Sequence, residues 1–256
     1  MFKHAIVRLP GTNFAQGLTT VELGAPLYDK VLQQHARYCE ALQECGLELV
    51  TLDADLDHPD STFVEDTAVL TARSAILARP GARSRQSEVA AIRPALHSFF
   101  PAMLEIEAPG TLDGGDIYEA DHRFFLGLSQ RTNEEGARQL AAYLAREGYA
   151  SAVVDVRGMS SILHLKSCVS YIGENTLVVM EEMAGLELFK GYELVRVTEQ
   201  ESYAANCVRV NERVLVAAGY PLLTAELKAR GFHPLELEMS EFQKMDGGLS
   251  CLSLRF

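Results

Sequence analysis

One repeating unit limits the folds open to this chain: a strand, a polar turn, a second strand, a helix and a third strand. Four segments are typical of β-hairpins, because short apolar runs flank a polar turn in residues 67–79, 116–127, 167–180 and 205–217. Further extended segments are expected at residues 47–52, 103–108, 152–156, 193–197 and 235–239. The unit recurs after roughly 40–50 residues, a period typical of arrays of small sheets.

Helical patterns follow most of these hairpins. Residues 26–45 predict an amphipathic helix whose buried face is expected to consist of Tyr28, Leu32, Cys39 and Leu42. Thr132 and Glu135 have the spacing of a capping box, in which each side chain satisfies a free backbone amide at the start of a helix. A helix opened by Ser87 should be kinked or shortened by Pro94.

These elements predict an α/β fold. Four copies of the unit are visible, and residues 1–52 together with residues 249–256 are able to complete a fifth. The expected architecture is therefore a five-bladed α/β propeller, closed by both ends of the chain. A plain three-layer sandwich is the competing interpretation, because the repeat period is irregular. In either case we expect residues 1–256 to form a single domain.

The charge balance restricts the classes of partner. The chain has 256 residues and a formal net charge of −12, with 48% hydrophobic and 23% charged residues, as in an ordinary soluble globular protein. Nucleic acids and anionic membranes bind basic faces, so neither is expected to be the main partner. The acidic balance is compatible with a small cationic substrate.

The absence of several sequence motifs bears on the expected compartment and cofactors. The apolar run at the N-terminus is too short for a signal peptide, and no stretch approaches the roughly 18 apolar residues of a membrane span, so we expect a cytoplasmic protein. Five cysteines without a C-x-x-C pair argue against a disulfide framework or a cysteine-rich zinc site. Phosphate-loop, dinucleotide and H-E-x-x-H motifs are absent, and no metal or organic cofactor is expected.

Three acidic clusters are candidates for chemistry. Glu65 and Asp66 interrupt an apolar run a few residues after Asp60, and such charges are costly to bury without a partner. They indicate either the polar edge of a hairpin or a pocket that presents anions to a cation. Asp113 precedes a glycine pair, which indicates either a simple turn or an aspartate held beside a ligand.

The third cluster ends in Cys251, four residues after the start of another glycine pair. Backbone amides in such a turn are able to lower the pKa of a thiol, although a cysteine near a chain end is usually buried and inert. His164 lies between leucines, which is typical of a core histidine, and six other histidines compete for any catalytic role. A cysteine, a histidine and an acid form a known nucleophilic arrangement, but spacing alone does not show that they meet.

The segments FVEDTAVL, LDGGD, LSQRTNEEGA, LHLKS, AANC and DGGLSC occur in this order. Together they resemble the dimethylarginine dimethylaminohydrolase family, and the likeness runs from the N-terminal strand to Cys251. That family belongs to the guanidine-modifying superfamily, whose fold is a five-bladed α/β propeller. The resemblance implies that Cys251 is the nucleophile, that His164 is the general acid and base, and that Asp113 orients the histidine.

The resemblance also implies a set of substrate-binding residues. These are Asp60, Glu65 and Asp66 around the guanidinium, Arg85 and Arg131 near the substrate carboxylate, and Leu18 and Met245 at the amino-acid end. Met245 stands where the family has a branched aliphatic residue.

The implied activity is hydrolysis of Nω-methylated arginine, asymmetric dimethylarginine and monomethylarginine, to citrulline and dimethylamine or methylamine. The substrate is a small cationic amino acid, and the reaction proceeds through a covalent thiouronium on the cysteine without a metal or cofactor. The resemblance is also compatible with a homodimer. One alternative is an arginine deiminase, which usually carries a helical insertion for which this chain has no visible room. Another is a non-enzymatic propeller that binds a partner, as in the ribosome anti-association factor, which would leave Cys251, His164 and Asp113 unexplained.

Overall fold

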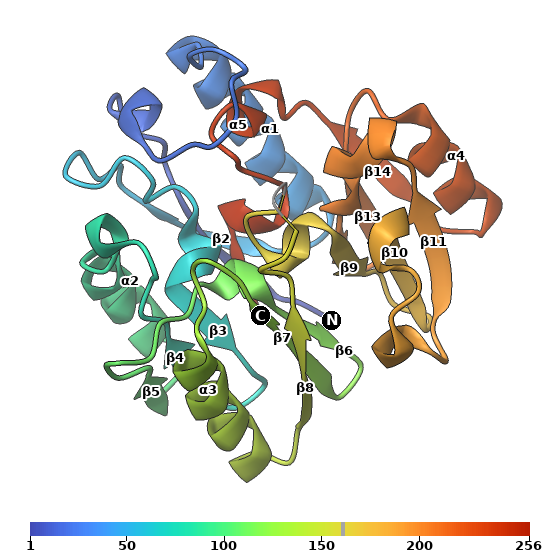
Figure 1. Cartoon of the computed structure of the whole chain (residues 1–256). Helices are drawn as coiled ribbons and strands as arrows, with labels where there is room; N and C mark the ends of the chain where they lie inside the picture. The colour runs from blue at the N-terminus through green and yellow to red at the C-terminus, as the bar shows by residue number, and fades with distance from the viewer. Residues whose placement is uncertain (160–161) are drawn as a thin grey trace.

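Five three-stranded sheets are arranged around the centre of the molecule (Figure 1). The computed structural model describes residues 1–159 and 162–256. In chain order the sheets, or blades, consist of the following strands: β1 (His4–Arg8) with β2 (Glu48–Leu52) and β15 (Leu254–Arg255); β3 (Ala68–Leu70), β4 (Ala75–Leu77) and β5 (Met103–Glu105); β6 (Ile117–Ala120), β7 (Arg123–Leu128) and β8 (Ala150–Asp155); β9 (Val169–Tyr171), β10 (Thr176–Met180) and β11 (Glu193–Val197); β12 (Val208–Val210), β13 (Arg213–Ala217) and β14 (Pro234–Leu237).

All five blades share one topology. A hairpin forms the first antiparallel pair in four of them, and its second strand then pairs in parallel with the strand that follows. In the remaining blade the C-terminal strand β15 takes the place of the first strand and pairs antiparallel with β1. The predicted five-bladed α/β propeller, closed by both ends of the chain, is confirmed, and the three-layer sandwich is wrong.

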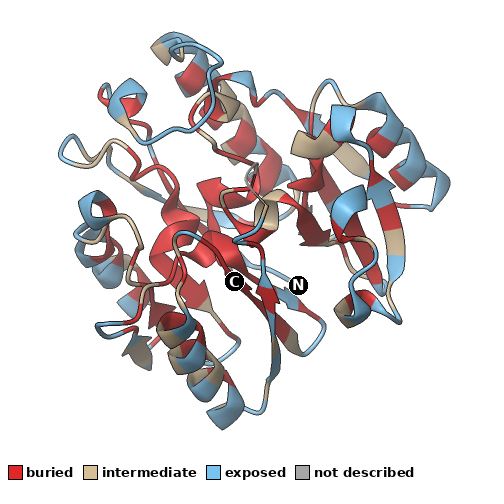
Figure 2. Cartoon of the chain, viewed as in Figure 1, coloured by how far each residue is buried: buried red, intermediate tan, exposed pale blue. Residues whose placement is uncertain are grey.

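Each sheet buries both faces, because successive side chains along a strand point to opposite sides. On β4, for example, Ala75 and Leu77 pack against the blade of β1, whereas Ile76 packs against the blade of β6 and β7. Five apolar clusters result, one between each pair of neighbouring blades. Figure 2 shows buried residues gathered on the strands and central turns, with exposed residues on the outer helices.

The blades also share a short 3-10 turn that leads into the first strand of each. These turns are η2 (Val64–Thr67), η4 (Gly114–Asp116), η5 (Leu165–Ser167), η8 (Glu199–Ala205) and η9 (Ser250–Leu252). Consecutive turns contact one another, and hydrogen bonds between Asn206 and Ser250 join the last two. The five turns therefore form a ring at the centre of the propeller.

The helices link the second and third strands within four of the blades. They are α1 (Tyr28–Glu44), α2 (Glu88–His97), α3 (Glu134–Arg146) and α4 (Pro221–Ala229), and a short helix α5 (Ser240–Gln243) precedes η9. The blade of β10 has only the 3-10 turns η6 (Glu181–Met183) and η7 (Glu187–Phe189) at this place. Two further 3-10 turns, η1 (Phe14–Gln16) and η3 (Arg83–Arg85), lie in connecting segments.

Two local predictions about helices are wrong. The buried face of α1 is formed by Val31, His35, Tyr38, Ala41 and Leu42, while Leu32 is exposed, so the predicted face is rotated by about one residue. Asn133 rather than Thr132 caps α3, because its side chain accepts the Gly136 N–H. Pro94 lies inside α2, which continues to His97, and the predicted kink at this residue stays a prediction.

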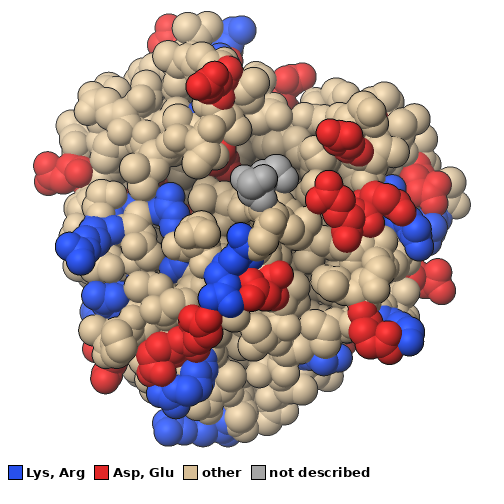
Figure 3. Space-filling view, in the orientation of Figure 1, with Lys and Arg blue, Asp and Glu red and all other residues tan. Residues whose placement is uncertain are grey.

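The surface carries charges of both signs. Figure 3 shows acidic and basic side chains interspersed on the face seen there, so the net charge of −12 is not gathered into one acidic patch on that face. Among the described residues, no helix is both long enough and apolar enough to cross a membrane.

Candidate active site

One pocket near the central ring collects most of the residues that the sequence singles out. Its lining consists of Leu18, Asp60, Phe63, Asp66, Arg85, Arg131, Leu163, His164, Met245, Asp246, Gly247 and Cys251. Segments from six parts of the chain thus converge, and the ring of turns brings η2 and η9 into contact there. Two of the predicted residues, Asp113 and Glu65, lie behind this lining rather than in it.

Cys251 lies on η9 and is buried. The Gly248 N–H donates to its sulfur at 3.4 Å. Burial, and after it the negative charges of Glu65 and Asp66, nevertheless raise the pKa of the Cys251 thiol to about 12. The Gly248 amide lowers this pKa, as expected, but burial and the two carboxylates outweigh it.

His164 is buried beside the acid that the resemblance assigns to it. Its Nε2 lies 3.1 Å from Oδ2 of Asp113, and the Gly81 N–H donates to the other oxygen of Asp113 at 2.8 Å. Burial disfavours the imidazolium, but the charges of Asp66 and Asp113 outweigh burial and raise the pKa of His164 to about 9. The imidazole is thus protonated at neutral pH and is able to donate a proton.

Asp66 faces the pocket as a fixed anion. Its two oxygens accept from Nη1 of Arg85 at 2.6 Å and from the Gly115 N–H at 2.9 Å. Burial alone would raise the pKa of Asp66, but His164 and Arg85 outweigh it and lower that pKa to about 2. The carboxylate is therefore ionised and has a fixed orientation.

Arg85 is occupied by the protein itself. Its Nε and Nη2 donate to Glu88, and Nη2 also donates to the carbonyl oxygens of Asp60 and Phe63. With Nη1 bound to Asp66, one N–H of the guanidinium has no partner among the described residues. Arg85 thus holds the acids of the pocket in place more than it offers donors to a ligand.

Arg131, unlike Arg85, has a guanidinium that is not engaged by other side chains of the described residues. This guanidinium makes no hydrogen bond within the described part of the chain, and the side chain is half-buried at the pocket.

Asp60, also in the lining, accepts the Leu18 N–H at 3.0 Å, and burial raises the pKa of Asp60. Leu18 is exposed and Met245 is buried, and both lie in the lining as well.

Asp246 was not predicted as a site residue. Its carboxylate accepts the N–H of Thr20 at 2.5 Å and the hydroxyl of Thr20 at 3.1 Å. It thereby connects the loop that carries Leu18 to the segment that leads to Cys251.

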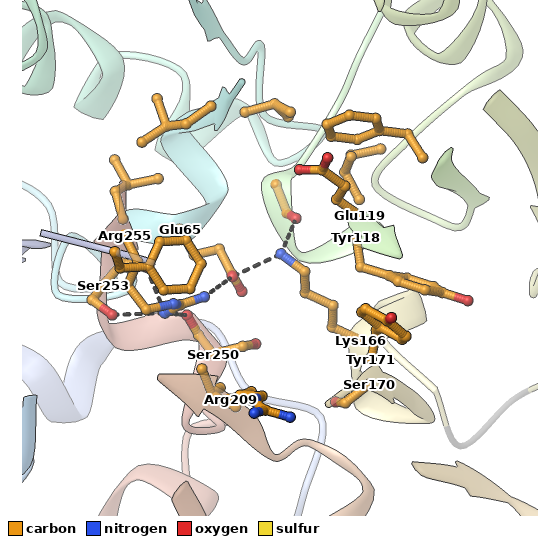
Figure 4. Close-up of a pocket in the computed structure, with 18 of the residues that line it drawn as sticks. Glu65, Tyr118, Glu119, Lys166, Ser170, Tyr171, Arg209, Ser250, Ser253 and Arg255 are labelled. Atoms are coloured by element: carbon orange, nitrogen blue, oxygen red, sulfur yellow. Dashed lines mark hydrogen bonds and ion pairs between the residues drawn. The ribbon is translucent and has the colours of Figure 1, made fainter. Parts of the chain in front are cut away.

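Glu65 is placed differently from the other acids. Its carboxylate accepts from Lys166 at 2.7 Å and from Arg255 at 3.2 Å, and it lines a second cavity behind the ring (Figure 4). Glu65 does not line the active-site pocket, and its predicted place around the guanidinium with Asp60 and Asp66 stays a prediction. Neighbouring residues of a 3-10 turn point about 120° apart, so the side chains of Glu65 and Asp66 take different directions.

Asp116 is a buried residue that the sequence did not single out as part of the site. It accepts the hydroxyls of Ser129 and Thr132 at 2.6 Å each and the Leu165 N–H at 3.0 Å. Burial raises the pKa of Asp116 to about 6. These hydrogen bonds hold Leu165, the residue after His164, in place. The sequence signal for Asp116 is its position as a second aspartate directly after the glycine pair.

In the first glycine pair, Gly114 and Gly115, glycine is required because neighbouring atoms approach the backbone closely. A Cβ at Gly115 would lie 2.8 Å from Nδ1 of His164 and 2.9 Å from Oδ1 of Asp66. Any side chain there would push the imidazole and the carboxylate apart.

The side chains of Asp66, Asp113 and His164 lie close enough together to hold a metal cation. One ligand atom each from Asp66, Asp113 and His164 lie within 4.8 Å of one another. Each is already engaged, since Arg85 and Gly115 bind Asp66 and Gly81 binds Asp113. The expectation that no metal is needed stays a prediction.

The fold and this site define a class, the guanidine-modifying α/β propellers, and residues 56–193 match the protein-family model of arginine deiminase. Over the whole of both chains, the sequence is 44% identical to the N(G),N(G)-dimethylarginine dimethylaminohydrolase of Pseudomonas aeruginosa. A solved structure of the Pseudomonas aeruginosa enzyme, a cysteine-to-serine variant complexed with citrulline, superimposes with a TM-score of 0.97 at 43% identity over 100% of each chain. A histidine-to-glycine variant of a dimethylarginine dimethylaminohydrolase, in an adduct with S-methyl-L-thiocitrulline, gives the same values. This chain belongs to the N(G),N(G)-dimethylarginine dimethylaminohydrolase family.

Proposed function

We propose that this chain hydrolyses asymmetric dimethylarginine and monomethylarginine to citrulline and dimethylamine or methylamine, with Cys251 as the nucleophile. The observation that carries the proposal is one pocket in which the thiol of Cys251, the imidazole of His164 and the ionised carboxylate of Asp66 meet. A planar cation with several N–H donors fits this lining, because carboxylates bind guanidinium groups with charge-assisted hydrogen bonds.

The substrate is held at both ends. Asp66, fixed by Arg85, accepts N–H donors of the unsubstituted guanidinium nitrogen, and Asp60 lies on the same side of the pocket. Arg131 has free donors and binds the α-carboxylate, while Leu18 and Met245 contact the amino-acid end. The pocket therefore selects a free amino acid with a guanidinium.

The reaction has two halves. The cationic guanidinium offsets the carboxylate charges that, together with burial, keep Cys251 protonated, so the thiol releases its proton to solvent water. The resulting thiolate attacks the guanidinium carbon to form a C–S bond. His164, protonated and held by Asp113, donates its proton to the departing amine as the C–N bond breaks. A thiouronium remains on Cys251.

The second half regenerates the enzyme. His164, now neutral, removes a proton from water, and the hydroxide adds to the thiouronium carbon. Collapse breaks the C–S bond, the urea group of citrulline forms, and the thiolate takes back a proton. One water is consumed for each amine released, and no oxidant or cofactor enters the balance.

The test is production of citrulline and amine from four substrates side by side: arginine and its monomethyl, asymmetric dimethyl and symmetric dimethyl forms. We expect equal amounts of citrulline and alkylamine from the asymmetric and monomethyl substrates. The symmetric isomer puts a methyl group where a carboxylate needs an N–H, which costs about 1–3 kcal/mol and so about tenfold to a hundredfold in kcat/KM. Preferential release of ammonia from arginine would instead identify a deiminase.

Two cysteine variants accompany the assay, one at the proposed nucleophile and one as its control. Cys251→Ala should abolish citrulline production while leaving the circular dichroism spectrum unchanged. Cys39→Ala, which alters a half-buried cysteine of α1, is the matched control and should retain activity. Turnover by the Cys251→Ala protein would place the chemistry on another residue.

A further inference from the structure

Three side chains outside the candidate active site have the order of an acid, a base and a nucleophile. Nδ1 of His58 lies 2.8 Å from Oδ2 of Asp55, and Nε2 of the same imidazole lies 2.6 Å from the hydroxyl oxygen of Ser87. A continuous hydrogen-bonded chain thus runs from a carboxylate through both ring nitrogens to a hydroxyl. The proposed chemistry at Cys251 uses none of these three residues, which are called the surface triad below.

The carboxylate of Asp55 fixes the tautomer of His58. Its Oδ2 faces Nδ1 of the imidazole, and its Oδ1 accepts the Asp57 N–H at 3.0 Å. Burial opposes ionisation of Asp55, but the hydrogen bonds from His58 and from the Asp57 N–H outweigh burial and lower the pKa of Asp55. The ionised carboxylate therefore keeps the proton of a neutral imidazole on Nδ1, which leaves the lone pair of Nε2 to accept the Ser87 O–H.

The hydroxyl of Ser87 is not used by the helix that it precedes. Ser87 is the N-cap residue of α2, where a serine side chain normally accepts a backbone N–H of the first turn. Here the side chain makes no capping hydrogen bond, and the hydroxyl is bonded to the imidazole instead. The contact with His58 thus replaces the usual structural role of a serine at this position.

The surface triad is open to solvent on the side of its nucleophile. Ser87 is exposed, whereas the side chains of His58 and Asp55 are only 19% and 17% exposed, so base and acid are shielded more than the hydroxyl. The ten residues of α2 follow Ser87 directly, and the first N–H groups of a helix have no carbonyl partner within it. Such N–H donors are able to stabilise the negative oxygen of a tetrahedral intermediate.

We propose that Asp55, His58 and Ser87 form a second nucleophilic site, which hydrolyses small activated esters such as aryl acetates. A hydroxyl on the surface gains little energy from substrate binding, so the ester must be reactive and must have a good leaving group. The proposal is independent of methylarginine hydrolysis, because Cys251 takes no part in it.

The reaction is an acyl transfer to Ser87 followed by hydrolysis. The Ser87 oxygen attacks the ester carbonyl carbon while Nε2 of His58 takes the hydroxyl proton. The C–O bond to the phenoxide breaks, the phenoxide takes the proton from His58, and an acyl group remains on Ser87. His58 then removes a proton from water, and the hydroxide adds to the acyl carbon. The C–O bond to Ser87 breaks, its oxygen takes the proton back, and a carboxylic acid leaves.

The test uses p-nitrophenyl acetate and the full chain carrying Cys251→Ala, so that the thiol does not react with the ester. Release of p-nitrophenol is followed by absorbance, and acetylated residues are located by tandem mass spectrometry after acid quenching. Acetylation is expected at Ser87 and not at Ser98. Ser98 is the internal control, because it is an exposed serine at the other end of α2 whose hydroxyl donates to the Pro94 carbonyl oxygen and has no imidazole partner.

Variants in the same background separate the three roles. Ser87→Ala should lose the enzymatic release of p-nitrophenol, and His58→Gln should slow it about a hundredfold, a typical contribution of a general base. Asp55→Asn should lower kcat for the ester with little change in KM, because an amide does not hold the proton on Nδ1. Ser98→Ala should leave the rate unchanged.

Two results would overturn the proposal. One is acetylation of Ser87 no faster than that of Ser98, a comparison within one protein that needs no variant of the surface triad. The other is ester hydrolysis that persists at the same rate in Ser87→Ala. Neither result bears on citrulline production by the wild type, so failure of this proposal and failure of the proposed function are distinguishable.

Discussion

The thiol of Cys251 should be protonated until a cation enters the pocket. Burial and the charges of Glu65 and Asp66 raise its pKa from the ordinary 9.0 to about 12. At pH 8 about one thiol in 10,000 would then be ionised, compared with about one in ten at the ordinary pKa. A neutral haloacetamide should therefore alkylate Cys251 about a thousandfold more slowly than an unperturbed thiol, and the rate should keep rising up to at least pH 10.

A cationic haloamidine of the same size provides the comparison. Its charge pairs with Asp66 and stabilises the thiolate, so it should react with Cys251 far faster than the neutral reagent at pH 8. Glu65→Gln removes one of the two carboxylates and should lower the pKa of the thiol, so the neutral reagent should alkylate Cys251 faster than in the wild type. A rate that levels off near pH 8 in the wild type, with similar reactivity toward both reagents, would refute this reasoning.

Four other outcomes test the remaining parts of the site. Arg131→Gln removes the cation with free donors and should raise KM for asymmetric dimethylarginine about tenfold to a hundredfold with little change in kcat; an unchanged KM in steady-state assays would assign the substrate carboxylate to Arg85. Asp113→Asn should lower kcat much more than it alters KM, since it leaves the imidazole poorly oriented; a pure KM effect would place Asp113 among the guanidinium ligands. Because the pKa of His164 is raised to about 9, its protonated form is present below that pH and is lost above it, so kcat should decline as pH rises through about 9; a decline centred near 6.5 would contradict the charge environment described here. Asp116→Ala leaves two hydroxyls and one N–H without their acceptor and should reduce the free energy of unfolding in urea by about 3 kcal/mol; a loss below about 1 kcal/mol would show that water replaces the carboxylate.

The propeller could be predicted from the sequence because its signal is local. Each hairpin is marked by apolar runs on both sides of a polar turn, and both faces of each sheet are buried, so the strands are short and strongly apolar. The helices were less certain at the level of single residues. On α1 the apolar residues Leu32 and Val31 are neighbours, and packing against β2, β14 and α5 decides that Val31 faces inward.

Side-chain competition explains the misassigned cap. Thr132 and Asn133 are both good capping residues, and sequence spacing favours Thr132 through its partner Glu135. In the structure the hydroxyl of Thr132 is taken by the buried carboxylate of Asp116, where a missing donor would be costly. Asn133 remains to cap the helix, so a tertiary contact determines a local feature.

The positions of the site residues follow from the same repeat. The segments that contain Glu65, Asp113, His164 and Cys251 each directly precede the first strand of a blade, and a pseudo-fivefold arrangement must bring such segments to the centre. The direction of each side chain is a separate matter, because in a 3-10 turn each residue is rotated by about 120° from the last. A change of one residue in the phase of η2 would turn Glu65 to the direction that Asp66 now takes and would turn Asp66 away from the active-site pocket. The sequence therefore determines which turns meet at the centre, whereas the contacts of Lys166 and Arg255 on one side and Arg85 on the other decide which acid faces the thiol's pocket.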